Sequence, residues 1–247
     1  MLDQPSSPPK PVTELWRPDL VALPRLTFSR RVFRVFLRGV TKLLTFLLLR
    51  AEVSGLENFP RHGPALIVFN HLGDTDAVLM MATLPFKSLV EGIGKIELNE
   101  HWLVGPVFRA HGIIWVHRGR PDRRALRAAL DALAEGRMVT LAPEGRQSVI
   151  GGLEEGNAGA AFLALRSGAP IVPVAMTGTE NSNIYGHLKQ WKRAPVTLRV
   201  GKPFFLPVHP SGDRQKTLQE GTRLIMETLA SLLPELYRGK FKSNPEK

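Results

Sequence analysis

Apolar and polar positions alternate along residues 53–237 in a way that predicts an α/β protein. Nearly continuous apolar runs, typical of buried strands, lie at 64–69, 112–116, 138–142, 170–176 and 195–200, with shorter candidates at 53–59 and 88–91. Segments with helical periodicity lie at 77–82, 98–109, 122–135, 157–166 and 215–237. Residues 92–97, which contain Lys95, read as a turn. Since strands that alternate with helices form parallel sheets with covered faces, we expect a mostly parallel sheet flanked by helices.

The first 50 residues depart from this pattern, which predicts a division into 1–50 and an α/β domain at 51–247. Residues 1–25 are rich in proline, serine and charge. They lack the apolar core of a signal peptide and are expected to form an extended or disordered arm. Residues 28–50 predict a basic amphipathic helix. Its cationic face carries Arg30, Arg31, Arg34, Arg38 and Lys42.

Two interpretations of the helix at 28–50 are open. A cationic stripe opposite an aromatic and leucine face is typical of a helix that lies in a membrane interface. The alternative is a helix that packs on the domain and leaves its basic face to solvent. In either case the unbroken apolar run of about ten residues falls short of the ~20 that a spanning helix needs.

The charge balance narrows the choice of partners. The chain of 247 residues has 33 basic and 22 acidic side chains, a net charge of +11 and a pI of about 10.4. This surplus favours anionic lipid, nucleic acid or phosphorylated substrates. Nucleic acid is not expected, because the sequence lacks the basic, aromatic signatures of RNA-binding modules. The absence of cysteine and of metal-ligand spacing among the seven histidines leads us to expect no metal and no other cofactor.

Polar clusters follow three predicted strands at the point where each strand ends. They lie at 70–76, at His117 and Arg118, and at 144–148. Because the carboxyl ends of parallel strands share one edge, we expect the clusters to converge. His71 precedes Asp76 by five residues, so the carboxylate can reach one imidazole nitrogen and leave the other for chemistry. The competing interpretation is that Asp74 or Asp76 only caps the next helix.

Four motifs between residues 53 and 202 carry a resemblance to the glycerolipid acyltransferase family, whose best-known members are the bacterial 1-acyl-sn-glycerol-3-phosphate acyltransferases. The motifs are Asn-His, four residues and Asp at 70–76, Gly-Ile-Ile-Trp-Val-His-Arg at 112–118, Pro-Glu-Gly-Arg-Gln-Ser at 143–148 and Ile-Val-Pro-Val at 171–174. Each motif alone is weak, whereas the four in the family's order and near its spacing are specific.

The resemblance implies a role for each matched residue. His71 is the general base, Asp76 orients it, and Lys95 helps to hold the thioester oxygen. The residues expected to bind the glycerophosphate are Arg118, Glu144, Gly145 and Arg146. We further expect Asp74, which directly precedes the helix, to be only a cap.

The chain departs from the family's pattern at positions that bear on the acceptor. His117 stands where the family usually has aspartate, and Asn157 where a lysine is usual. In the third motif Arg146 occupies the usual threonine place and Gln147 the usual arginine place. The guanidinium is therefore moved by one residue.

The expected activity is transfer of a fatty acyl group from acyl-CoA or acyl carrier protein to the free hydroxyl of a lysophospholipid, most simply lysophosphatidic acid. The enzyme is expected at the cytoplasmic face of the cell membrane, held peripherally or monotopically on an anionic surface. Two other functions stay open at this point. One is a non-catalytic lipid- or membrane-binding relative, and the other is a thioesterase-like hydrolase in which water replaces the hydroxyl.

Overall fold

The computed structural model describes residues 8–85, 89–119, 121–207 and 213–242. Predicted features at 1–7, residue 88 and 243–247 lie outside these residues. The strands of the described chain are β1 (Leu49–Ser54), β2 (Ala65–Phe69), β3 (Val90–Lys95), β4 (Ile114–Val116), β5 (Met138–Leu141), β6 (Ile171–Thr177) and β7 (Ala194–Val200). The helices are α1 (Phe28–Leu48), α2 (Thr75–Thr83), α3 (Val104–His111), α4 (Arg123–Ala134), α5 (Gly159–Ser167), α6 (Asn181–Lys189) and α7 (Arg214–Leu232).

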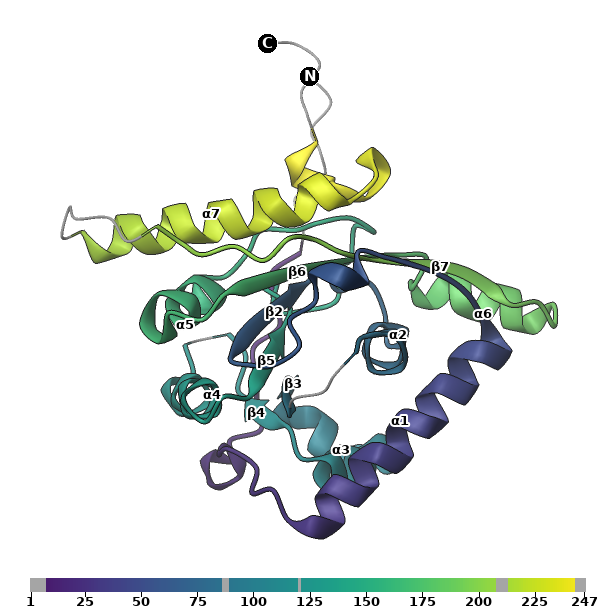
Figure 1. Cartoon of the computed structure of the whole chain (residues 1–247), viewed down its shortest axis with the longest axis horizontal. Helices are drawn as coiled ribbons and strands as arrows, with labels where there is room; N and C mark the ends of the chain where they lie inside the picture. Colours follow the sequence, from purple (N-terminus) through teal and green to yellow (C-terminus); the bar gives the residue numbers. More distant parts are fainter. Residues whose placement is uncertain (1–7, 86–88, 120, 208–212, 243–247) are drawn as a thin grey trace.

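The strands form one seven-stranded sheet in the order β1-β7-β6-β2-β5-β3-β4 (Figure 1). Every neighbouring pair is parallel except β6 and β7, which run antiparallel. Strands β6, β2, β5, β3 and β4 therefore end at the same edge. This arrangement confirms the predicted mostly parallel sheet flanked by helices.

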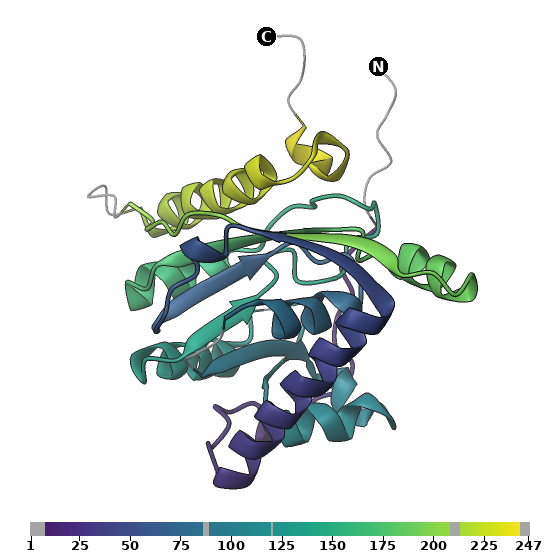
Figure 2. The same ribbon diagram turned by 45° about the vertical axis from the view of Figure 1, so that its right-hand side comes forward.

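Helices cover both faces of the sheet, and β2 contributes side chains to both. Leu66 and Val68 belong to the core under α4, α5 and α7, whereas Ala65 and Ile67 belong to the core that contains Leu79 of α2. All four are fully buried, as expected for a central parallel strand. Helix α1 lies outside α2 and contacts α2 and α3, at the margin of the molecule (Figures 1 and 2).

Several element boundaries differ from the sequence prediction. Residues 92–95 belong to β3 and are not a turn, and Gly94 leaves room there for the side chain of Ile113. A Cβ on Gly94 would lie 2.5 Å from Cδ1 of Ile113. Helix α6 was not predicted, since Ile184 is its one buried residue and no apolar period marks it. The chain of α1 passes into β1 at Leu49, earlier than predicted, and α7 ends at Leu232.

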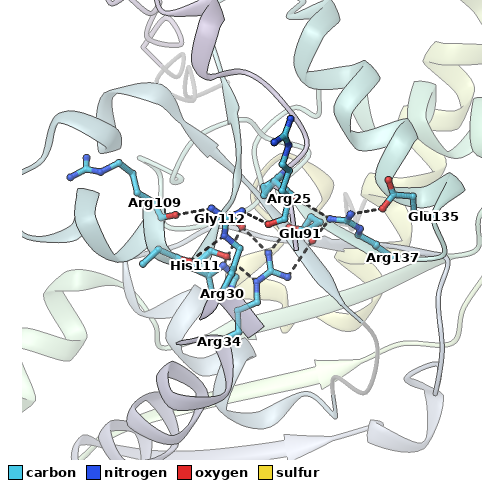
Figure 3. Close-up of polar contacts among 11 residues, drawn as sticks. Arg25, Arg30, Arg34, Glu91, Arg109, His111, Gly112, Glu135 and Arg137 are labelled. Carbon is cyan, nitrogen blue, oxygen red and sulfur yellow. Dashed lines mark hydrogen bonds and ion pairs between the residues drawn. The ribbon is translucent and has the colours of Figure 1, made fainter. Parts of the chain in front are cut away.

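Helix α1 packs on the protein with its arginine face, which is the reverse of the packed-helix interpretation (Figure 3). Arg34 donates two hydrogen bonds to the buried carboxylate of Glu91, at 3.2 and 2.7 Å, and others to the carbonyls of His111 and Gly112. Arg137 donates to the same carboxylate from the other side, at 3.0 Å. Glu91 thus ties α1 to the sheet through two guanidinium groups. Burial, with the charge of Arg34, lowers the pKa of the neighbouring His111 to about 4, which keeps that ring neutral at pH 7.

The outer face of α1 is apolar and solvent-exposed. Thr41 and Thr45 are the buried residues of α1, and Arg38 donates to the carbonyl of Leu84. Exposed Arg31 and Lys42 lie beside the apolar face. That face consists of Phe28, Val32, Val35, Phe36, Leu43, Phe46 and Leu47. Among the described residues, no helix has the length and apolar character needed to cross a membrane.

Removing the charge of Glu91 should destabilise the fold strongly. Glu91→Gln leaves the guanidinium of Arg34 without its carboxylate partner and leaves Arg137 with Glu135, and the free energy of unfolding should fall by about 3–5 kcal/mol. Urea denaturation measures the change. Glu227→Gln is the matched control, because its ion pair with Arg223 is exposed and its loss should cost about 0.5 kcal/mol or less. Equal effects of the two substitutions would contradict this account of Glu91.

Candidate active site

The carboxyl-terminal edge of the sheet gathers the predicted site residues as the topology requires. His71 follows β2, Glu144 follows β5, Lys95 ends β3, and Arg118 follows β4. In the sheet these strands lie in the order β2-β5-β3-β4. The three polar clusters therefore line one edge.

His71 and Asp76 form a hydrogen-bonded pair at the start of α2. Oδ2 of Asp76 lies 2.7 Å from Nδ1 of His71 and also accepts from the backbone N–H groups of Leu72 and Gly73. The carboxylate is fully buried, whereas the side chain of His71 is 28% exposed. Asp76 therefore fixes the ring through Nδ1. Nε2 of His71 receives no hydrogen bond from the described residues.

The loop that carries His71 is fixed at two further points. The Asn70 amide donates to the carbonyl of Met176 and accepts from its N–H, at 2.8 and 2.7 Å, which ties the end of β2 to β6. Oε1 of Glu144 accepts from the N–H of His71 at 3.0 Å, and Oε2 from the N–H of Glu154 at 2.9 Å. The sequence analysis assigned no role to Asn70. The feature that could have indicated one is a side-chain amide placed directly after an apolar strand.

Glu144, predicted by the resemblance to bind the glycerophosphate, is fully buried in the structure. Its carboxylate supports the His71 loop through the backbone N–H of His71. Burial raises the pKa of Glu144 to about 7, although the two backbone N–H groups favour the charged form. Gly145 supports the same turn with φ +75°, a conformation that side-chain-bearing residues rarely adopt.

The three predicted cationic residues differ in how their charges are engaged. Arg146 is 7% exposed and pairs with Glu154, with Nε and Nη2 at 3.0 and 2.6 Å from one oxygen. Lys95 is exposed at the end of β3. Arg118 is half-buried, and its guanidinium has no hydrogen-bond or ion-pair partner among the described residues, even though Nε is shielded from solvent. The guanidinium of Arg118 is therefore available to bind an anion.

Asp74 does not cap α2, contrary to the prediction. It occupies the residue before the helix, but its side chain makes no capping hydrogen bond. Its carboxylate instead accepts from Nε2 of Gln147 at 2.7 Å and from Nδ2 of Asn181 at 3.1 Å. Asp74 thus joins the 70–76 loop to the third motif and to α6.

The family assignment rests on a match between a family's sequence pattern and the part of the chain that contains these residues. The sequence pattern of the Acyltransferase family matches residues 50–177, about half of the chain, and includes His71, Asp76, Lys95, Arg118 and the Glu144 turn. The chain belongs to the acyltransferase family. It is therefore an enzyme of acyl transfer, and the resemblance stated from its motifs is confirmed.

Similar proteins agree with this assignment. A 1-acyl-sn-glycerol-3-phosphate acyltransferase of Borreliella burgdorferi is 26% identical over 184 residues, 73% of this chain and 69% of the relative. The human 1-acyl-sn-glycerol-3-phosphate acyltransferase alpha is 30% identical over 136 residues, 54% of this chain and 47% of the relative. An uncharacterised protein of Mycobacterium tuberculosis is 32% identical over 181 residues, 65% of this chain and 45% of that protein. The chain thus spans less than half of the latter two proteins.

A solved structure supports the fold. The crystal structure of the 1-acyl-sn-glycerophosphate acyltransferase PlsC of Thermotoga maritima superposes with a TM-score of 0.57 at 24% identity. The match covers 82% of this chain and 83% of that one. At this level of identity the likeness concerns the arrangement of helices and strands.

Replacing the Glu144 carboxylate by an amide should disturb the His71 loop. Glu144→Gln turns one acceptor oxygen into an NH₂ group that opposes a backbone N–H of His71 or Glu154. The free energy of unfolding should fall by about 1–3 kcal/mol, the cost of an unsatisfied buried group. Chemical denaturation measures this change. The control is Glu155→Gln, since that side chain is exposed. An unchanged stability of Glu144→Gln would show that the carboxylate is dispensable.

Proposed function

We propose that this acyltransferase moves a fatty acyl group from a thioester to the free hydroxyl of lysophosphatidic acid, giving phosphatidic acid. The observation that carries the proposal is the His71–Asp76 pair, with Nδ1 held at 2.7 Å and Nε2 left for a substrate. The Borreliella and human relatives, both 1-acyl-sn-glycerol-3-phosphate acyltransferases, support the choice of acceptor. Acyl-CoA and acyl carrier protein are both suitable donors, because each presents the same thioester.

The reaction needs only one proton carrier. Nε2 of His71 takes the proton of the acceptor hydroxyl as its oxygen attacks the thioester carbon. Asp76 stabilises the imidazolium that forms and keeps Nδ1 protonated. The tetrahedral intermediate then collapses, the C–S bond breaks, and the imidazolium returns the proton to the leaving thiolate. Backbone N–H groups and exposed Lys95 are proposed to stabilise the oxyanion.

Arg118 is proposed to bind the acceptor's phosphate. Its guanidinium is unpaired within the described residues, and a guanidinium matches phosphate through parallel hydrogen bonds. Arg146 is already paired with Glu154, so its proposed contribution is to shape the loop that borders the phosphate. Binding the phosphate holds the hydroxyl near His71 and so supplies positioning.

The apolar face of α1 is proposed to dock the enzyme on an anionic membrane at the cytoplasmic side. Val35 and Phe36 are 75% and 62% exposed, and such residues can enter the headgroup boundary. Arg31 and Lys42 flank this face and can contact anionic lipid. Since Arg30, Arg34 and Arg38 bind the protein itself, they are not part of the proposed lipid contact.

Labelled acyl-CoA, with and without lysophosphatidate, tests the proposed reaction. The expected result is labelled phosphatidate that forms only when the acceptor is present. Labelled fatty acid formed equally without acceptor would identify a hydrolase. No release of label in either reaction would indicate a lipid-binding relative, and both results contradict the proposal.

His71→Ala should lower kcat about 10²–10⁴-fold, the usual contribution of general-base catalysis, and should leave the protein folded. Asp76→Asn should also lower kcat, because an amide can hold the ring in the wrong tautomer. Steady-state kinetics with the labelled donor measure both changes, and circular dichroism checks the fold. His62→Ala serves as the histidine control outside the proposed machinery. A folded His71→Ala protein with nearly normal kcat would exclude His71 as the base.

The double substitution Val35→Ser, Phe36→Ser should weaken pelleting with anionic vesicles at low salt, because it removes buried apolar area from the interface. Arg31→Gln with Lys42→Gln should lose about 1 kcal/mol per charge and flatten the salt dependence. Leu236→Ser is the control, since Leu236 is 74% exposed but lies beyond α7 on the other side of the sheet. Wild-type protein that ignores anionic vesicles, or equal losses in all variants, would disprove docking through α1.

A further inference from the structure

The amino-terminal arm, residues 8–20, is attached to the same sheet edge as the site. Thr13 and Arg118 exchange two hydrogen bonds: the N–H of Thr13 donates to the carbonyl of Arg118 at 3.0 Å, and the N–H of Arg118 donates to Oγ1 of Thr13 at 2.7 Å. Val12 lies against Gly119, where a Cβ would come within 2.7 Å of it. The arm therefore has a defined path directly beside the proposed phosphate ligand.

His117 fixes the arm at a second point. Oδ2 of Asp122 accepts from the backbone N–H and from Nδ1 of His117, at 3.0 and 2.7 Å. With Nδ1 carrying the proton, Nε2 accepts from the N–H of Arg17 at 3.1 Å. The ring of Trp16 packs on the same imidazole, with centroids 4.5 Å apart. Both nitrogens of this buried ring are engaged, so His117 holds the arm and is not available as a base.

The first described residues of the arm, 8–10, bring the ammonium group of Lys10 to the Glu144 loop. Nη1 of Arg146 donates to the carbonyl of Pro9 at 3.2 Å. Nζ of Lys10 donates to the carbonyl of Glu155 at 2.8 Å and to Oδ1 of Asn157 at 3.3 Å. Asn157 in turn donates to the carbonyl of Glu144 at 3.2 Å. The side-chain amide of Asn157 thus connects the ammonium of Lys10 to the Glu144 turn, which supports the His71 loop.

The charge balance at this edge leaves a place for Lys10. Arg146 is neutralised by Glu154, and Gln147 is neutral and bound to Asp74. Among the described residues of this edge, Arg118 supplies an unpaired guanidinium and Lys95 is exposed at the end of β3, where it is proposed to serve the thioester oxygen. A phosphate monoester carries close to two negative charges at pH 7, so Arg118 by itself does not balance it. Burial lowers the pKa of Lys10, and the positive charge of Arg146 lowers it further. The negative charge of Glu154 opposes part of this decrease. A bound anion would favour the charged form of Lys10.

We propose that Lys10 is a specificity-determining residue that binds the phosphate of the acceptor together with Arg118. The arm is then one wall of the acceptor site, and it selects a phosphorylated lysolipid over the same lipid without phosphate. This inference rests on the proposed function, since it assumes a phosphorylated acceptor. The ammonium has two neutral oxygen partners, and its third N–H is left for an anion.

Steady-state kinetics with two acceptors test this role. Lysophosphatidate and monoacylglycerol share the free hydroxyl and differ in the phosphate. Lys10→Ala should raise KM for lysophosphatidate about 10- to 100-fold, as the loss of a charge-assisted hydrogen bond does, with kcat nearly kept. KM for the acyl donor and activity toward monoacylglycerol should stay unchanged. Lys10→Arg, which keeps the charge, should restore most of the affinity.

Lys240→Ala is the matched control. Lys240 also contacts Glu155, through its carboxylate at 2.9 Å, but lies on the outer side near the carboxyl terminus. It should leave both KM values unchanged. If Lys10→Ala matches Lys240→Ala while wild type still prefers lysophosphatidate, Lys10 is not a phosphate ligand, although the proposed function stands. An increased KM for the donor instead would assign Lys10 to the phosphates of CoA. Wild type without any preference for lysophosphatidate would overturn both proposals.

Discussion

The candidate active site depends on one buried carboxylate, that of Glu144, which holds two separate loops by their backbone N–H groups. One hydrogen bond fixes the residue that carries the imidazole, and the other fixes the loop around Glu154, whose side chain in turn neutralises Arg146. Because a carboxylate without donors is costly to bury, the two loops must adopt these conformations together. The distance between His71 and Asp76 is therefore a property of the strand ends β2 and β5, and not of α2 alone.

A second buried carboxylate, that of Glu91 in β3, organises the attachment of α1. It is held by Arg34 of α1 and by Arg137 just before β5, so it joins the peripheral helix to the central sheet. The consequence is an inverted helix, with charges inward and leucine and phenylalanine outward. Exposed apolar faces of this kind mark interaction surfaces, which is the reason for proposing that α1 docks on a bilayer. The two carboxylates thus have the same physical role, since each joins separate segments of the chain through buried polar contacts.

The sequence was sufficient for the architecture and for the central pair, because both follow from local rules. Apolar runs of strand length and the strand-end rule placed His71, Arg118 and Glu144 on one edge, whereas Lys95 was expected in a turn and came only from the resemblance. Two failures are local, namely the turn expected at 92–97 and the missed helix α6, and the others concern interactions that no local pattern marks. Periodicity located α1 but could not tell which face was buried, since the partner Glu91 lies 57 residues away from Arg34. Asp74 looked like a cap for the same reason, since its partner Gln147 is 73 residues away. Arg146 looked like an unengaged cation although Glu154 is only eight residues away, because both lie in a loop without periodicity.

Helix α1 continues into β1 without an intervening loop, as the N–H of Leu49 still donates to the carbonyl of Thr45. Because no loop separates them, the orientation of α1 is set relative to β1 and the sheet. An enzyme that rests on a bilayer through α1 would keep a constant tilt and a constant height above the headgroups. Its encounter with a lysolipid then becomes a two-dimensional search, whose rate follows the mole fraction of lysolipid in the surface and not its concentration in the bulk.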